Sequence, residues 1–396
     1  PWPQARRKNE IRTMMQFRAA APPGLESILE AEARRHGFLQ DSEKTVVSPL
    51  GGIFFSGDWP VLSRANLLLR APARITVQLP AFRADSFSEL VTKARRLPWE
   101  YFLAPQSSVH FNVACRKSRL YHSDAVEERL RGAVLHKIGK KVRFLNAGEA
   151  TQHGAQLIQV RLNRDVCYIE VDSSGEHLRK RGYRPALGKA PLREHLAAAM
   201  LLFAGWDGHS PLIDPFCGSG TLLWEGYHLF RGVDTETAQE QLAKLPLSHW
   251  PVFQSGGSLL PALAEAEVPH PDVASLLFGS DRNQGAIDDA LENARLLGLA
   301  DRVSLKKQAF SAIEPMGEKG WIVANLPYGV RTAGKGDLRN LYAKLGNLLR
   351  ERFGGWRFAF LSNSEFLLGH SGLKFQEQLT FDNGGIRVLL VRGEIA

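Results

Sequence analysis

The stretch Ile213–Glu225, which reads IDPFCGSGTLLWE, constrains the fold of this chain more than any other. An apolar run ends at Asp214, two glycines follow within a few residues, and a second apolar run begins at Thr221. This pattern predicts a strand, a tight turn and a helix. Glycine has no Cβ atom, so a ligand can approach the turn closely, and the free N–H groups of the new helix point toward it. We therefore expect a ligand site at this turn.

Strand-like and helix-like runs alternate through the rest of the C-terminal half. This alternation predicts an α/β fold with a mostly parallel, doubly wound, Rossmann-like sheet. Gly372–Arg392 leaves no room for a helix between its two strand-like runs, so we expect a terminal antiparallel hairpin. The segment Arg231–Pro271 is interpreted as an insertion. The expected strands are Leu212–Asp214, Leu276–Asp281, Val303–Lys306, Trp321–Asn325, Trp356–Ser362 and Arg387–Arg392, and the expected helices include Ala190–Ala204, Thr221–Phe230, Gln284–Leu297 and Leu338–Phe353.

The length of 396 residues indicates more than one domain. Residues 14–60 have the pattern of a small α/β unit, with a strand at Met14–Ala20 and a helix at Leu25–His36. A second α+β unit follows. Its expected elements include a strand over Arg74–Phe82, a helix over Ser86–Leu97 that Ser86 or Ser88 caps, and a β-hairpin over 156–171. We therefore divide the chain into units at 1–60, 61–173 and 190–396, with a basic linker at 174–189.

Positive charge is concentrated in the first half of the chain. Residues 1–190 contain 31 Lys and Arg against 18 Asp and Glu, a formal charge of +13, whereas residues 191–396 contain 19 against 23, a charge of −4. This asymmetry favours a nucleic-acid-binding part joined to a part that carries out the chemical reaction. The alternative is a solvated basic surface that binds no partner, with Tyr121 packed inside the protein. Lys and Arg attract phosphates, and aromatic rings can stack on unpaired bases. The predicted RNA-binding residues form one expected cluster, Arg116, Lys117, Arg119, Tyr121, His122, Lys140 and Lys141, together with Arg181 of the linker.

Composition disfavours several functional classes. The three cysteines, Cys115, Cys167 and Cys217, are scattered along the chain and lack zinc-binding spacing. This pattern favours a protein of the reducing cytoplasm, and it disfavours a disulfide framework and a bound metal. No run of about 18 apolar residues occurs, and no apolar stretch follows the basic start of the chain. We therefore expect a cytoplasmic protein with no membrane span and no secretory signal.

A second ligand-binding feature is expected at Asp281, which ends the run LLFGSD. An acidic residue after the second strand of such a sheet can accept hydrogen bonds from ribose hydroxyls. In dinucleotide-binding proteins this residue follows the glycines by about 20 residues. Here the spacing from Gly220 exceeds 60 residues, which disfavours a dehydrogenase. A nucleotide P-loop has Lys followed by Ser or Thr after its last glycine. Here Thr221 and Leu222 follow Gly220, which disfavours a P-loop.

A third feature, NLPYG at 325–329, follows another expected strand. An exocyclic base amine is a poor nucleophile because its lone pair is delocalised into the ring. Two acceptors on its N–H groups can hold it pyramidal and stabilise developing positive charge. The Asn325 amide oxygen and the Leu326 carbonyl suit this role. Pro327 stiffens the turn, and the Tyr328 ring can stack on a flipped base. An ordinary turn after a strand is the alternative.

Together these motifs resemble a known group of enzymes. DPFCGSGT at 214–221 and NLPYG at 325–329 look like the amino-methyltransferases that use S-adenosylmethionine (AdoMet), and the resemblance extends to HLRKRGYR at 177–184. SRLYHSDAVEERL at 118–130 is similar to the THUMP RNA-binding domain, and residues 14–60 resemble a ferredoxin-like domain that precedes it. Over nearly its whole length, the chain resembles the bacterial THUMP family that makes N2-methylguanine in 23S rRNA of the large ribosomal subunit.

The resemblance implies roles for individual residues. Cofactor binding would involve Asp214, Pro215, Cys217, Gly218, Gly220, Thr221, Asp281, Arg193 and Glu194. The target base and its amine would be bound by Asn325, Leu326, Pro327 and Tyr328. The methyl group would pass directly to nitrogen, with neither a metal nor a covalent intermediate. We interpret Cys217 as a small pocket-lining residue rather than as the nucleophile of a cytosine-C5 enzyme.

The sequence departs from the family pattern at Gln308-Ala309-Phe310, where relatives usually carry an acidic residue that touches the adenine amine. Either a backbone group or Asp301 substitutes, or the affinity for AdoMet is lower. We expect no second methyltransferase module in this chain. Two other functions stay open: an N6-adenine methyltransferase acting on RNA or DNA, and a catalytically silent RNA-binding or ribosome-assembly factor.

Overall fold

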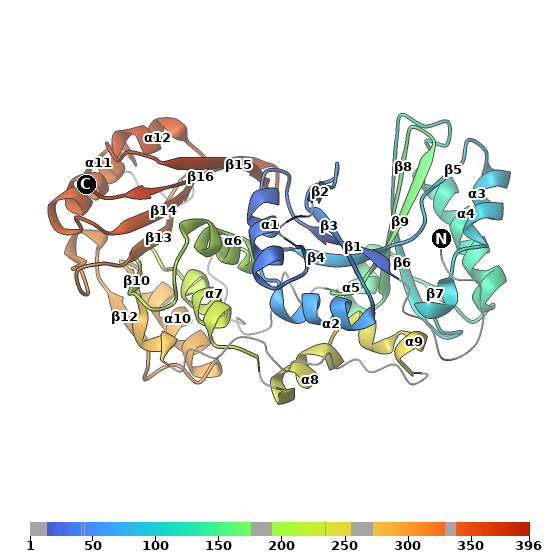
Figure 1. Ribbon diagram of the computed structural model, residues 1–396, viewed down its shortest axis with the longest axis horizontal. Helices are drawn as coiled ribbons and strands as arrows, with labels where there is room; N and C mark the ends of the chain where they lie inside the picture. Colours follow the sequence, from blue (N-terminus) through green and yellow to red (C-terminus); the bar gives the residue numbers. More distant parts are fainter. Residues whose placement is uncertain are drawn as a thin grey trace.

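Two β-sheets with surrounding helices make up the computed structural model of the chain (Figure 1). The structure describes residues 14–40, 42, 44–175, 192–233, 235–254, 272–328 and 338–396, so Arg181 and most of the basic linker lie outside it. In Figure 1 the first sheet, blue to green, occupies the middle and one end of an elongated molecule. The second sheet, yellow-green to red, occupies the other end.

The first sheet is built from β1 (Met15–Ala20), β2 (Val46–Val47), β3 (Ile53–Gly57), β4 (Arg74–Gln78), β5 (Phe82–Arg83), β6 (Ser108–Arg116), β7 (Arg143–Phe144), β8 (Gln156–Asn163) and β9 (Val166–Asp172). Their order is β2-β3-β1-β4-β9-β8-β6-β7, with β5 paired to β9. Neighbours are antiparallel, except that β6 is parallel to β7 and β8. Because β4 pairs with both β1 and β9, one sheet continues across residue 60. The domain division placed there stays a prediction.

Four helices pack against one face of the first sheet: α1 (Glu26–Arg35), α2 (Trp59–Leu68), α3 (Phe87–Ala94) and α4 (Ser123–Ile138). Side chains alternate between the two faces of a strand, so one face of each strand is apolar. Phe17, Val77 and Val171 lie in one row across β1, β4 and β9 and are fully buried in the core that these helices share. The opposite face is polar. There Arg18 of β1 forms a buried ion pair with Glu170 of β9, with 2.5 Å between Nη2 and Oε2.

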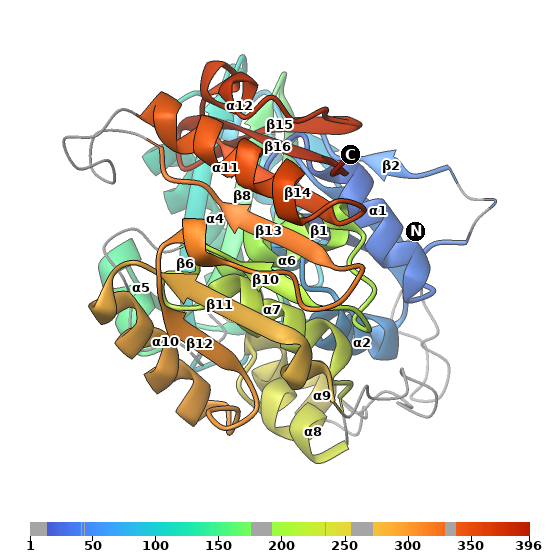
Figure 2. The ribbon, with the colours of Figure 1, turned by 90° about the vertical axis from the view of Figure 1, so that its left-hand side faces the viewer.

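The second sheet is built from β10 (Leu212–Asp214), β11 (Leu277–Asp281), β12 (Ser304–Lys307), β13 (Trp321–Asn325), β14 (Arg357–Ser362), β15 (Glu377–Asn383) and β16 (Ile386–Glu394). Their order is β12-β11-β10-β13-β14-β16-β15, and Figure 2 shows them stacked from β12 at the bottom to β15 at the top. The strands from β12 to β14 are parallel, and β16 is antiparallel to both of its neighbours. The expected parallel sheet with a terminal antiparallel hairpin is thus confirmed.

Helices cover both faces of the second sheet. α6 (Glu194–Ala204), α7 (Thr221–Phe230) and α10 (Gln284–Leu296) pack on one face, and α11 (Leu338–Arg352) and α12 (Glu365–His370) pack on the other. Val323 of β13 belongs to the first of these cores, whereas Ile322 and Ala324 belong to the second. A strand covered on both faces is apolar throughout, which explains the uninterrupted apolar run of β13. Short 3₁₀ helices lie at Trp99–Tyr101, Pro246–His249, Val273–Leu276 and Phe310–Ala312.

The insertion after α7 contains α8 (Thr235–Ala243) and α9 (Pro251–Gln254), which pack against the first half of the chain. α8 contacts α2, and α9 contacts the 3₁₀ turn at Trp99–Tyr101. The Trp250 indole N–H donates to Gln156 Oε1 over 2.7 Å, and the Trp250 ring centroid lies 4.9 Å from that of Phe102. In Figure 1 both helices lie beneath the first sheet. The insertion therefore fastens the second half of the chain to the first.

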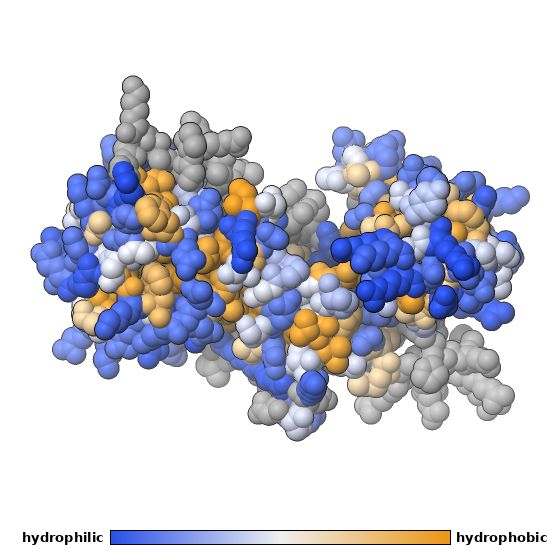
Figure 3. All heavy atoms as spheres, turned by 90° about the horizontal axis from the view of Figure 1, so that it is seen from above, coloured by the Kyte–Doolittle hydropathy of each residue, from blue (hydrophilic) through white to orange (hydrophobic). Residues whose placement is uncertain are grey.

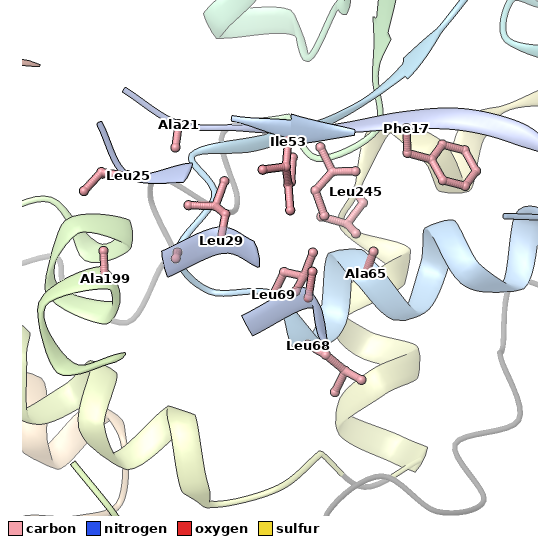
Figure 4. Close-up of a cluster of buried hydrophobic side chains, with 14 of the residues drawn as sticks. Phe17, Ala21, Leu25, Leu29, Ile53, Ala65, Leu68, Leu69, Ala199 and Leu245 are labelled. Carbon is pink, nitrogen blue, oxygen red and sulfur yellow. The ribbon is translucent and has the colours of Figure 1, made fainter. Parts of the chain in front are cut away.

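Buried contacts also join the two halves directly. Arg70, which follows α2, forms an ion pair with Glu225 of α7, with 2.9 Å between Nε and Oε2. Leu25 and Leu29 of the first half lie in one apolar cluster with Ala199 of α6 (Figure 4). A shared buried core holds the halves in one arrangement, unlike the small polar interface that permits domain motion. None of the helices in the described ranges is long and apolar enough to cross a membrane.

Two local expectations differ from the structure. The strand expected over Arg74–Phe82 is wrong, because β4 ends at Gln78 and the short β5 begins after Pro80. Proline has no N–H group for a sheet ladder, so the strand breaks there. The helices α5 (Ala147–His153), α8, α9 and α12 were not expected, because each is short and has little apolar periodicity. Ser86, one of two candidate caps, does cap α3, since its side chain accepts from the N–H of Glu89.

Candidate active site

The glycine-rich turn connects the end of β10 to the start of α7, as the sequence predicts. Gly218 and Gly220 have φ angles of +52° and +84°, a region that favours glycine. A Cβ atom on Gly220 would lie 2.5 Å from the Trp224 ring, whereas one on Gly218 would meet no atom within 4 Å. Packing of α7 therefore requires Gly220, while the Gly218 side of the turn opens onto free space that a ligand can enter.

Hydrogen bonds from distant elements hold this turn in place. The Ser219 carbonyl accepts from the Trp224 indole N–H over 2.8 Å and from the Asn293 amide of α10 over 3.1 Å. The Cys217 N–H donates to the Ser280 carbonyl of β11 over 3.0 Å. Sequence reasoning missed the role of Asn293, because it is one of several polar residues in α10 and only the structure shows that it faces the buried side of the helix.

Two carboxylates lie at the adjacent ends of β10 and β11. Asp214 is 2% exposed and accepts from the N–H of Phe216 over 3.1 Å. Asp281 accepts from the N–H groups of Gly218, over 3.3 Å, and Asn283, over 2.9 Å. Burial raises the pKa of Asp214 to about 8; the Phe216 hydrogen bond opposes this rise and the charge of Asp281 adds to it. A cationic ligand nearby would favour the ionised form of Asp214.

Cys217 is buried inside the same turn. Burial raises the pKa of its thiol well above the ordinary value, and the neighbouring charges of Asp214 and Asp281 raise it further. Nucleophilic cysteines act as thiolates and sit in electropositive surroundings. The environment of Cys217 is the opposite, which supports the pocket-lining role over the nucleophile.

An aromatic pair stands where the family pattern has an acidic residue. Phe310 follows β12, and its ring centroid lies 5.5 Å from that of Phe216 in the glycine-rich turn. The Gln308 N–H donates to the Asp281 carbonyl over 3.0 Å, which fixes the start of this segment. Asp301 is exposed and precedes the first residue of β12, so it lies at the opposite edge of the parallel sheet. The suggestion that Asp301 substitutes for the missing acid is therefore wrong.

Asn325 ends β13 at the same edge of the sheet as Asp214 and Asp281. Its Oδ1 atom is buried and has no hydrogen-bond partner among the residues that the structure describes. The backbone that follows is held firmly: the Leu326 N–H donates to the Leu361 carbonyl over 3.0 Å. An unsatisfied buried amide oxygen costs about 1–3 kcal/mol and is typical of a functional site.

Pro327 and Tyr328 complete the described part of this motif. The Tyr342 hydroxyl of α11 donates to the Pro327 carbonyl over 3.3 Å. The Tyr328 ring is partly buried against the core that includes α6 and α7. Burial raises the pKa of the Tyr328 phenol, and a hydrogen bond with the Asn383 side chain opposes that rise.

Arg193 and Glu194 lie where α6 begins. Arg193 occupies the N-cap position of α6, and Glu194 is buried in its first turn. Nη2 of Arg193 is 3.3 Å from the place that a Cβ atom on Gly384 would take. Arg193 thus lies beside the β15–β16 turn, and α6 packs against α7, the helix that starts at the glycine-rich turn.

The structure divides the expected basic cluster into two. One group, Arg116, Lys117, Arg119, Tyr121 and His122, precedes α4, whereas Lys140 and Lys141 follow it. α4 spans Ser123–Ile138, about 24 Å at 1.5 Å per residue, so the single cluster expected from the sequence is wrong. Figure 3 shows a strongly hydrophilic patch over the end of the molecule that holds α3, α4 and the β8–β9 hairpin.

Tyr121 is 68% exposed, and its ring centroid lies 4.0 Å from that of His122. The alternative that Tyr121 packs inside the protein is therefore excluded. An exposed aromatic ring among cations suits stacking on an unpaired base. Within the described ranges, no group of three or more His, Cys, Asp or Glu side chains could hold a metal ion.

Comparison with known proteins gives three family matches. A model described as "RMKL-like, methyltransferase domain" matches residues 181–391, more than half of the chain. A model described as "RlmL ferredoxin-like domain" matches residues 16–76, and the THUMP domain model matches residues 84–172. The three matches follow the same order as the units expected from the sequence.

Two curated relatives match almost all of this chain. "Putative RNA methyltransferase slr0064" of Synechocystis sp. is 29% identical over 97% of both chains. "Ribosomal RNA large subunit methyltransferase K/L" of Syntrophotalea carbinolica is 30% identical over 96% of this chain, which spans 54% of that relative.

A solved structure shares the whole fold. The crystal structure of SMU.472, "a putative methyltransferase complexed with SAH", has a TM-score of 0.73 and 23% identity, and the match covers 98% of this chain and 99% of that one. The ferredoxin-like, THUMP and Rossmann-like methyltransferase parts expected from the sequence are confirmed. The chain therefore belongs to the family of RMKL-like methyltransferases.

Proposed function

We propose that this chain transfers the methyl group of AdoMet to an exocyclic base amine in RNA, namely N2 of a guanine in 23S rRNA. The buried Oδ1 atom of Asn325 carries the proposal, because no residue in the described ranges satisfies it. It lies at the sheet edge that holds the glycine-rich turn. At this edge of the sheet, the Asn325 Oδ1 atom can accept a hydrogen bond from the amine of an incoming base.

The residues around the turn fit AdoMet. Gly218 leaves open space for the methionine part, and Asp281 can accept hydrogen bonds from the ribose hydroxyls. Asp214 offers a carboxylate for the cationic end of the cofactor. The Phe216 and Phe310 rings provide an apolar surface for adenine in place of the usual acidic residue. When bound, AdoMet supplies an electrophilic methyl group on a positively charged sulfur.

The target amine is activated by position rather than by a strong base. Oδ1 of Asn325 and the Leu326 carbonyl accept one N–H group each, so the nitrogen lone pair is directed at the methyl group. Transfer forms the N–CH3 bond as the S–CH3 bond breaks and a neutral thioether leaves. It places positive charge on nitrogen, which these two oxygens stabilise until one N–H proton is lost to solvent. The ring of Tyr328 stacks on the base, which must be flipped out of any helix to reach the site.

RNA is the substrate that the first half of the chain suits. The THUMP domain carries Tyr121 and the basic residues at the start of α4, which can contact phosphates and an unpaired base. The names of the two curated relatives indicate RNA methylation, in one case of large-subunit rRNA. An rRNA substrate also fits the expected cytoplasmic location.

Nucleoside analysis tests the proposal. The purified chain is incubated with labelled AdoMet and rRNA from a strain that lacks the gene, and the digested product is examined by mass spectrometry. We expect N2-methylguanosine at one position of 23S rRNA. N6-methyladenosine would support the adenine alternative instead. RNA binding without AdoMet binding at millimolar cofactor, measured by calorimetry, would support the silent factor.

A further inference from the structure

The β15–β16 hairpin projects beyond the edge of the second sheet. Asn325, Leu361, Leu390 and Leu379 lie in one row across β13, β14, β16 and β15. β14 ends one residue after this row, at Ser362, but β15 and β16 stay paired as far as Asn383 and Ile386. At about 3.4 Å per residue, the hairpin overhangs the sheet by roughly 10 Å at the edge where Asn325 lies.

One face of the hairpin runs from the core into the open beside Tyr328. Phe381 and Val388 are directly opposite each other and are buried, and the Asn383 side chain, further along β15, forms a hydrogen bond with the Tyr328 hydroxyl. Two residues further along, Asn383 and Ile386 are directly opposite and point to the same face. Ile386 is 51% exposed, so this apolar face continues past the protein core.

The hairpin is held on two sides. The tip turns at Gly384 and Gly385, with φ angles of +63° and +87°, and the Arg193 guanidinium lies against Gly384. On the other side, a Cβ atom on Gly24 would lie 2.2 Å from the Thr380 carbonyl, so the loop before α1 packs directly on β15. Figure 1 shows β15 reaching toward α1. The tip is therefore fixed between the two halves of the molecule.

We propose that the hairpin tip, Asn383–Arg387, forms a wall of the target-base site, with Asn383 positioning the Tyr328 ring and Ile386 contacting the extruded nucleotide. This inference rests on the proposed function. The Tyr328 ring can rotate about its side-chain bonds, and a hydrogen bond at its hydroxyl limits that rotation. A stacked base then keeps its amine in line with the two acceptors at Asn325 and Leu326. Small misplacements of reacting atoms cost large factors in rate.

A double-mutant cycle tests the role of Asn383. Single-turnover methyl transfer is measured at saturating RNA and AdoMet for Asn383→Ala, Tyr328→Phe and the double variant. We expect Asn383→Ala to lower the rate about 10-fold, the worth of one hydrogen bond. In the Y328F background, the same substitution should have no further effect, because the hydroxyl is already gone. An additional 10-fold loss there would overturn the proposal.

The matched control for Asn383→Ala is Gln378→Ala. Gln378 lies on the same strand, is exposed, and pairs with Val391 away from the tip. We expect its rate and RNA KM to equal those of the wild type. AdoMet affinity should be unchanged in Asn383→Ala, which separates ring positioning from damage to the cofactor turn. A matching loss of AdoMet affinity would contradict the positioning role.

Substitutions at Ile386 test the wall itself. Ile386→Asp should raise the KM for RNA about 10-fold, because a carboxylate repels phosphate and replaces the apolar contact with the nucleotide. Ile386→Leu should behave like the wild type. The thermal midpoint should be the same for both variants, since the side chain is half exposed. An unchanged KM in Ile386→Asp would overturn the contact. If the wild type itself methylates no RNA, the proposed function fails instead.

Discussion

At the scale of single residues, the site buries polar groups at a cost to the stability of the fold. Oδ1 of Asn325 and the hydroxyl of Ser280, next to Asp281, are both buried without a hydrogen-bond partner in the described part of the chain. Asp214 is buried with its pKa raised to about 8. Each such group lowers stability, and proteins retain them mainly where a ligand or a reaction uses them. All three lie at the same edge of the second sheet.

Replacing Asn325 with alanine should abolish methyl transfer, with a rate loss of about 100-fold or more, because one acceptor for the target amine is removed. Affinities for AdoMet and RNA should stay nearly intact, and the free energy of unfolding should not fall, since a buried unsatisfied oxygen disappears. Single-turnover assays, calorimetry and urea unfolding measure these effects. The surface variant Asn347→Ala is the control. Loss of RNA and AdoMet binding together would mean that Asn325 is structural.

The carboxyl of Asp214 should make stability depend on pH. Its pKa rises from the ordinary value of 3.8 to about 8 in the folded chain, so the native state binds more protons than the unfolded state between these values. Stability is therefore highest at the low end of this window and is lost as pH rises toward 8. Urea unfolding without cofactor should show the wild type losing stability relative to Asp214→Asn between pH 5 and 8. A difference that is independent of pH would contradict this.

At the scale of elements, the length of α4 decides which basic residues can act together. The residues before α4 and those after it are about 24 Å apart, more than twice the Debye length at physiological salt. They cannot form one exposed electrostatic patch. The group before α4 also contains the exposed Tyr121–His122 pair, which makes it the better candidate for RNA contact.

Charge reversal at both Arg116 and Lys117 should weaken RNA binding and flatten its salt dependence. The slope of log affinity against log salt should fall by roughly one to two units, one for each lost phosphate contact. Fluorescence anisotropy at several salt concentrations measures the slope. The matched comparison is Lys140→Glu with Lys141→Glu, for which we expect a smaller change. An unchanged salt slope in the Arg116 and Lys117 variant would show that the residues at the start of α4 do not contact RNA phosphates.

At the scale of the whole molecule, the RNA-binding half and the chemical half share one core. The ion pair between Arg70 and Glu225 lies in this interface, with the Glu225 side chain fully buried on the helix that begins at the glycine-rich turn. The insertion with α8 and α9 adds a second connection, through Trp250 and Gln156. Such a joint keeps the base-binding and cofactor-binding residues at a fixed distance from RNA contacts far along the molecule.

Substituting Glu225 with glutamine should destabilise the chain by about 3 kcal/mol or more, because Arg70 stays charged while its buried carboxylate partner is lost. The double variant Arg70→Leu with Glu225→Leu should be less unstable than the sum of its single changes. Urea unfolding gives the values. Glu377→Gln, which removes an exposed partner of Arg392, is the control and should cost less than about 1 kcal/mol. If the loss of unfolding free energy in the double variant equals the sum of the two single losses, Arg70 and Glu225 do not interact energetically.

Much of the candidate site was predictable because its parts are local. A strand, a glycine turn and a helix follow one another within Ile213–Glu225, and the asparagine of NLPYG directly ends a strand. The carboxyl ends of parallel strands share one edge of a sheet, so these motifs had to lie near one another. The doubly wound fold and its terminal hairpin followed from the same periodicity.

What the sequence determined by itself was the set of chemical groups at the sheet edge, because strand periodicity and glycine turns act over a few residues. Only the tertiary structure decided which distant residues hold those groups. Asn293 supports Ser219 and Asn383 supports Tyr328 across gaps of more than 50 residues, and α4 separates cations that looked contiguous. Such contacts depend on which faces pack and on how far each strand extends. The local sequence pattern predicts neither of these features, because the position of a hydrogen-bonding side chain in the sequence does not indicate which distant residue it will contact.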